Sequence, residues 1–144
     1  MAALTNNRKA AQYGTNGPLV QEFRLPVNGT SRLFAGGLVA LNSEGNAIPA
    51  GLSAGGSVRT MGVAQAEANN TAGADGAMFV QVRRGAFPFA NSAAGDAITI
   101  ADVGATVYVV DNQTVAKTDG TGTRIAAGKC VGFDGTMVIV EVGI

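Results

Sequence analysis

The run Phe-Val-Gln-Val-Arg-Arg-Gly-Ala-Phe-Pro-Phe at residues 79–89 constrains the fold more than any other stretch. Its first half alternates, so Val80 and Val82 are expected on one face of a β-strand and their neighbours on the other. Gly85 and Pro88 then interrupt the strand, because glycine marks a bulge and proline cannot donate to a ladder. We therefore expect a central strand that breaks at the glycine, with the Phe-Pro-Phe end turning a corner or lying at an edge.

Turn-forming clusters divide the rest of the chain into short strands at intervals of roughly 8 to 12 residues. The clearest hairpin joins residues 106–110 to residues 114–117, and a second turns at Asp134-Gly135. Residues 98–104 can hold one helical turn, ended by a glycine. The pattern predicts an all-β domain of about 8 to 10 short strands, arranged as a small β-barrel or a sandwich.

The composition favours a protein that assembles. The 144 residues suffice for one domain, and 47% are hydrophobic while only 14% are charged. The surface must therefore carry many small uncharged residues, which suit close contact between subunits. We expect a homo-oligomer, the alternative being a compact β domain that is simply rich in Ala and Gly.

The N-terminal residues 1–22 have neither helical nor strand periodicity and are dense in turn formers. Their apolar side chains are too widely spaced to form a core of their own, so they need a surface to dock on. That surface is either the β domain of the same chain or a partner. We therefore divide the chain into an extended arm, residues 1–22, and a β domain, residues 23–144. The expected anchors to a partner are Leu4, Arg8, Lys9, Tyr13, Leu19 and Phe23.

The residues of an active site are scarce in this chain. It has no histidine, and its one cysteine, Cys130, lacks the basic partner of a cysteine hydrolase. No glycine-rich segment has the phosphate-loop pattern, and no acidic run has the spacing of a calcium loop. Aspartates instead sit singly in turns, which we expect them to cap: Asp96, Asp102, Asp111, Asp119 and Asp134. The sequence thus predicts no catalytic residue, no metal and no cofactor, so the chain is not expected to be an enzyme.

Nucleic acid and membranes are not expected partners. The net charge is zero, no apolar run reaches membrane-spanning length, and no secretion signal is visible. Arg83 and Arg84 lie near Phe87 and Phe89, a combination that can stack single-stranded bases. Successive arginines point to opposite faces of a strand, however, so they form no single basic stripe. We expect these four residues to make a subunit contact or a structural ion pair instead.

Three stretches of the chain carry a family resemblance. The first is Ala-Leu-Thr-Asn-Asn-Arg-Lys at residues 3–9, with Leu-Phe-Ala-Gly-Gly-Leu-Val-Ala-Leu at 33–41. The second leads through Val-Gln-Val-Arg-Arg-Gly at 80–85, and the third through Val-Tyr-Val-Val-Asp-Asn-Gln-Thr-Val-Ala-Lys-Thr at 107–118. Together they resemble the capsid decoration, or cement, proteins of tailed bacteriophages.

The resemblance implies a virion protein with a β-barrel-like or tulip domain. Such a domain binds the outer surface of an assembled head, often as a trimer, and reinforces junctions between capsomers. The implied partners are the major capsid protein and further copies of the chain, and synthesis would occur in the host cytoplasm. This chain departs from the family in its longer segment between Tyr13 and Phe23. The alternative is a phage tail or adhesion component; a carbohydrate-binding module is disfavoured because Trp is absent.

Overall fold

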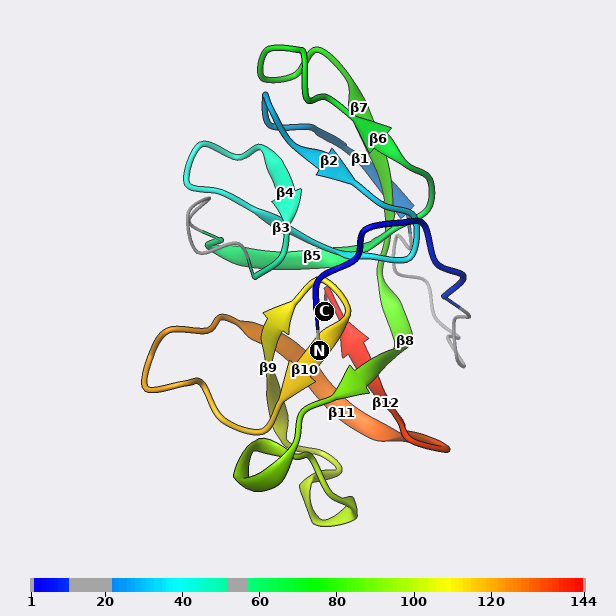
Figure 1. Ribbon diagram of the computed structural model, residues 1–144, viewed down its shortest axis with the longest axis vertical. Coiled ribbons are helices and arrows are strands. Elements are labelled where there is room, and N and C mark those ends of the chain that lie inside the picture. Colours follow the sequence, from blue (N-terminus) through cyan, green and yellow to red (C-terminus); the bar gives the residue numbers. More distant parts are fainter. Residues whose placement is uncertain (1, 11–21, 52–56, 144) are drawn as a thin grey trace.

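The computed structural model describes residues 2–10, 22–51 and 57–143. Figure 1 shows two halves stacked along the long axis, each built from β-strands. The strands are β1 (Glu22–Pro26), β2 (Arg32–Leu33), β3 (Leu38–Leu41), β4 (Ala47–Pro49), β5 (Arg59–Ala64), β6 (Ala68–Asn69), β7 (Phe79–Arg83), β8 (Gly85–Asn91), β9 (Thr106–Asp111), β10 (Thr114–Ala116), β11 (Ala126–Asp134) and β12 (Met137–Val142). Two short 3-10 turns, η2 (Ala94–Asp96) and η3 (Ile100–Asp102), complete the described elements. The all-β prediction is confirmed.

The first half, β1 to β7, contains a five-stranded sheet in the order β1-β7-β5-β3-β4, with the pair β2-β6 beside it. The second half, β8 to β12, is a closed barrel in the order β10-β8-β12-β11-β9. Alternation along the strands builds two buried clusters. Val80 and Val82 belong to one within the first half, and Val107 and Val109 belong to a larger one that spans the junction and includes Leu38 and Val63 of the first half. The described strands exceed the expected 8 to 10 because β2 and β6 have only two residues each, too few to show a period.

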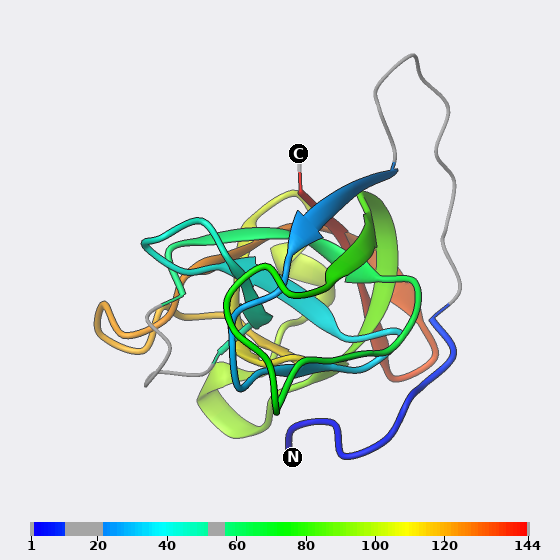
Figure 2. The same cartoon turned by 90° about the horizontal axis from the view of Figure 1, so that it is seen from above.

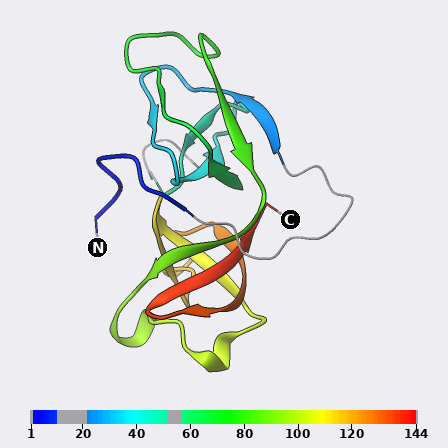
Figure 3. The ribbon, with the colours of Figure 1, turned by 90° about the vertical axis from the view of Figure 1, so that its right-hand side faces the viewer.

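The chain passes from the first half to the second through Arg84 and Gly85, where β7 gives way to β8 (Figure 3). The expected corner at Phe-Pro-Phe is corrected, because β8 continues through Pro88, which pairs with Ile139 of β12. On its other side β8 pairs with β10 only from Ala90 onward. The missing N–H of proline therefore leaves no ladder bond unmade, and this part of β8 has the character of an edge.

The two halves repeat one topology. Strands β1, β3, β4, β5 and β7 correspond in order to β8, β9, β10, β11 and β12, since both sets have the same neighbours. The parallel β8–β10 pairing that closes the second half has its counterpart in the parallel bridge between Val27 and Ala47. Gly62 lies opposite Val39 beside a bulge, and Gly128 lies opposite Val107 beside the equivalent bulge.

Individual main-chain hydrogen bonds repeat as well. The N–H of Gly36 donates to the carbonyl of Ala64 at 2.8 Å, as that of Gly104 donates to Cys130 at 2.7 Å. The N–H of Ala64 donates to Gly37 and that of Cys130 to Ala105, both at 3.0 Å. The N–H of Asn28 donates to Ala47 at 3.0 Å, and that of Ser92 donates to Val115 at 3.1 Å. The correspondence is therefore defined residue by residue in the turns as well as in the strands.

The turns follow the sequence expectations. Both predicted hairpins are present, as β9–β10 and β11–β12. The carboxylate of Asp111 accepts from the N–H of Gln113 at 2.9 Å, and that of Asp102 accepts from the N–H of Thr99 at 2.8 Å, so these two aspartates cap turns. Within the described ranges, no helix has the length and apolar character needed to span a bilayer.

Candidate functional site

Residues 2–10 lie against the junction of the two halves (Figure 1) and run along the outside of the molecule when it is seen from above (Figure 2). Arg8 holds them there: its Nε donates to the carbonyl of Gly36 at 2.7 Å, and its Nη2 donates to that of Pro88 at 2.8 Å. The guanidinium also lies 5.3 Å from the ring centroid of Phe89. Burial lowers the pKa of Arg8, but an arginine remains charged at any physiological pH. One cation thus bridges carbonyls of both halves.

The other anchors expected in the arm have different surroundings. The N–H of Leu4 donates to Oδ1 of Asn112 at 2.9 Å, and its side chain is half-buried. Lys9 is exposed. Leu4 and Arg8 therefore dock on the β domain of their own chain, the first of the two surfaces considered, which corrects their assignment to a partner. Tyr13 and Leu19 lie outside the described residues.

Phe23 and Arg83 lie on strands of the first half, and Arg84 lies where the chain leaves that half. Phe23 is half-buried in β1 and packs against the first core, with the guanidinium of Arg84 5.5 Å from its ring centroid. Arg83 pairs with Glu22 at 2.5 Å on the neighbouring strand. For Arg83 the structure shows an ion pair within the chain, the second of the two roles expected for it.

Phe87 and Phe89 require a correction. Their side chains are 1% and 0% exposed and pack in the core of the second half. They were expected at a subunit contact because they border an arginine pair. In β8, however, residues 87 and 89 point into the barrel, so neither ring can reach another subunit.

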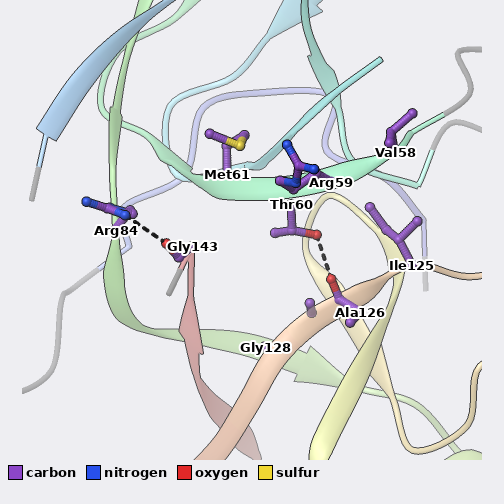
Figure 4. Close-up of a pocket in the computed structure, with 10 residues that line it drawn as sticks. Val58, Arg59, Thr60, Met61, Arg84, Ile125, Ala126, Gly128 and Gly143 are labelled. Carbon is purple, nitrogen blue, oxygen red and sulfur yellow. Dashed lines mark hydrogen bonds between the residues drawn. The ribbon is translucent and has the colours of Figure 1, made fainter. Parts of the chain in front are cut away.

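A pocket of about 410 Å³ opens where the two halves meet (Figure 4). Its walls come from the start of β5, the β7–β8 junction, the start of β11 and the C-terminal end of the described chain. The lining residues are Val58, Arg59, Thr60, Met61, Arg84, Ile125, Ala126, Ala127, Gly128 and Gly143. Val58 is 54% exposed although it is apolar. The pocket thus combines small and apolar side chains with two arginines.

The pocket lies beside the start of β5, which is paired with a strand on one side only. β5 pairs with β3 from Arg59 to Val63, but with β7 only at Val63 and Ala64. Within the described residues, no strand is paired with Arg59 and Thr60 on the side of β7, while at Met61 that side is covered by Gly143, where an added Cβ would lie 2.4 Å from the Met61 carbonyl oxygen. The hydroxyl of Thr60 donates to the carbonyl of Ala126 at 2.7 Å, which ties this part of β5 to β11. A half-paired strand beside a pocket can accept an extended segment as an added strand.

The sequence reasoning missed Val58, Arg59 and Thr60. None of these three residues was among the expected site residues, and β5 begins at Arg59. The available signal was the apolar Val58, followed by two residues that continue the strand. The two walls of the pocket lie far apart in the chain, so no local pattern could join them.

Possible metal ligands do not gather in the part of the chain that the structure describes. There, no group of three or more His, Cys, Asp or Glu side chains is placed to hold an ion. Comparison with known proteins gave no match to any protein-family model, curated protein or solved structure.

Proposed function

We propose that this chain is a structural virion protein, a capsid decoration protein that binds the outside of an assembled phage head and reinforces the junctions between capsomers. Its partners are the major capsid protein and further copies of itself. The family resemblance of residues 3–9, 33–41, 80–85 and 107–118 suggests this role, and the all-β fold agrees with it.

The observation that carries the proposal is the half-paired strand β5 beside the junction pocket. An extended segment of the shell protein would add alongside Arg59 and Thr60, where main-chain hydrogen bonds supply affinity without demanding a particular sequence. Val58 and Met61 offer apolar contacts in the same pocket. Arg59 and Arg84 favour a segment with acidic side chains at its rim.

The test measures attachment to heads purified without this protein. A double variant, Val58→Asp with Arg59→Glu, replaces an apolar and a cationic side chain of the pocket by acidic ones and changes no residue of the two cores. It should weaken binding by at least about tenfold. Arg24→Glu is the control for the arginine reversal, because Arg24 is exposed on β1 and undergoes the same charge change as Arg59→Glu. Thermal unfolding of each variant would show that the fold is kept.

Two results would overturn the proposal. One is full occupancy of the heads by the double variant with unchanged affinity, which excludes the pocket. The other is attachment of the wild-type chain to purified tails and not to heads, which excludes the decoration role.

A further inference from the structure

Three exposed apolar side chains gather in the second half, beside the turn that leads into β9. Ile100 of η3 is 78% exposed, and Val103 and Val131 are each 43% exposed. The turn is held against β11 by a 2.7 Å hydrogen bond from the N–H of Gly104 to the carbonyl of Cys130, the residue before Val131. We call these three side chains the η3 patch.

The repeat identifies an equivalent place in the first half, and there it is occupied. The turn at Gly104 corresponds to the turn at Gly36, and both glycines have positive φ, +92° and +81°. Residues 7–10 of the N-terminal arm lie on the Gly36 turn: the N–H of Arg8 donates to the carbonyl of Ala35 at 2.9 Å. Oδ1 of Asn7 accepts from the N–H of Ala35 at 3.0 Å.

No described residue covers the turn at Gly104 in this way. A Cβ built on Gly36 would come within 2.4 Å of the Arg8 carbonyl oxygen, whereas one on Gly104 meets no atom of the described residues within 4 Å. The two turns therefore share a backbone shape, and among the residues that the structure describes only the first carries an extended segment. The carbonyl of Val103 stands where that of Ala35 accepts from Arg8.

The side chains around the turn at Gly104 favour a segment more apolar than the one that lies on the turn at Gly36. Val103 stands where the first half has Ala35, and Val131 stands where it has Gln65, by the same correspondence that pairs Cys130 with Ala64. A segment that docked here would contact two valines and an isoleucine in place of small or polar groups. Burial of these side chains would be the main source of affinity.

We propose that the η3 patch binds the N-terminal arm of a second copy of this chain, through Pro18-Leu19-Val20. The arm is the segment that occupies the equivalent turn in its own chain, and this run is the longest apolar stretch in its second half. Residues 11–21 are flanked by Arg8, held at the junction, and by Glu22 of β1 in the first half, whereas η3 lies at the far end of the second half in Figure 1. That separation favours the patch of a neighbouring copy over the patch of the same chain.

Cross-linking identifies the occupant directly. A photoreactive benzoyl-phenylalanine is placed at Ile100, whose exposure lets it be replaced without disturbing the core, and light and heavy isotope-labelled chains are mixed. The expected products join position 100 of one chain to residues 11–22 of another. Cross-links that form only within a chain, or that map to another surface, overturn the proposal.

Sedimentation equilibrium measures the energetics. Ile100→Ser with Val103→Ser should weaken self-association by at least about tenfold, and so should Leu19→Ser with Val20→Ser. Phe79→Ser is the control, because Phe79 is a 50% exposed apolar residue of β7. A wild-type chain that stays monomeric at about 0.5 mM, or an unchanged association of either double variant, contradicts the contact. No head is present in either experiment, so this inference can fail while the proposed function stands.

Discussion

The guanidinium of Arg8 and the carbonyl of Pro88, 80 residues apart in the chain, are joined by a hydrogen bond of 2.8 Å. The same side chain reaches Gly36 in the first half, so the arm is fastened to both halves by a single cation. Both acceptors are neutral carbonyls at the junction. Removal of the cation would leave them without this donor and would loosen residues 2–10 from the junction.

Arg8→Ala should therefore destabilise the protein by about 2 kcal/mol, since hydrogen bonds from a charged donor contribute about 1.5 to 3 kcal/mol. Urea denaturation measures the change, and Lys9→Ala, at the exposed neighbouring position, should remain within about 0.5 kcal/mol of the wild type. Hydrogen exchange at the N–H of Ala35 should also accelerate in Arg8→Ala. Equal stability of the two variants would show that the arm is not docked in solution.

Gly128→Ala should be among the most destabilising single changes in the second half. A Cβ there would lie 1.9 Å from the carbonyl oxygen of Glu141 on β12, so the two strands must separate. We expect a loss of about 2 to 4 kcal/mol in the free energy of unfolding. Gly132→Ala is the matched control, with φ of +159° against +155°, and with open space at its Cβ position. Equal losses in the two variants would mean that backbone conformation, not the contact, sets the cost.

Asp96 should make the protein less stable in acid. The Thr118 hydroxyl and the Arg124 guanidinium donate to its carboxylate, and these hydrogen bonds lower the pKa of Asp96 below its usual value. A carboxyl whose folded pKa is depressed contributes stability above its unfolded pKa and loses it as pH falls through the folded pKa. The melting temperature of Asp96→Asn should lie below that of the wild type at neutral pH. The gap should close as pH falls below about 4.

A gap that stays constant down to the lowest pH would assign the effect of Asp96→Asn to something other than the charge. Glu44→Gln, at an exposed turn position, controls for the removal of a carboxylate.

Attachment to heads should depend weakly on salt. The net charge is zero and only 14% of the residues are charged, so apolar and main-chain contacts are expected to dominate over Arg59 and Arg84. Affinity should fall less than about tenfold between about 50 mM and about 200 mM salt. A loss of about a hundredfold or more over this range would show that several charge contacts drive binding.

The assembled form should be a trimer with a mass three times the 14.4 kDa of the chain. Exchange of one arm and one η3 patch per copy closes on itself in a ring, which leaves no open-ended contact. Light scattering of the purified protein measures the mass. A dimer would reject the trimer while leaving the exchange of arms possible.

Sequence patterns predicted the elements whose signals are local. The two hairpins, the turn capped by Asp102 and the alternation at Val80 and Val82 all rest on residues close together in the chain, and the structure has them. The continuation of the strand through residues 87–89 was not predicted, because a proline inside a strand is tolerated only where one side of that strand lacks a partner. That circumstance depends on β10, a strand that follows more than 20 residues later.

The repeat and the junction pocket could not be found in this way. Residues identical between the halves are few and scattered: Phe23 and Phe87, Gly36 and Gly104, Val39 and Val107, Gly62 and Gly128, Val80 and Val138, Val82 and Val140, and Gly85 and Gly143. The added strands β2 and β6 and the turns η2 and η3 change the spacing between them. A search of the sequence for a repeat of fixed length therefore fails. The equivalent main-chain hydrogen bonds, in contrast, show which residues of the two halves correspond.

The shared order of strands in the two halves also bears on the origin of the chain. Duplication and fusion of a gene for one five-stranded unit would produce this topology directly, with Gly85 and Gly143 as descendants of the same terminal glycine. An ancestor of that kind would have paired two separate polypeptides across the surface now closed by Thr60 and Ala126. After such a fusion each copy could diverge, and the arm would then be a later addition over the Gly36 turn, without a counterpart among the described residues at the Gly104 turn.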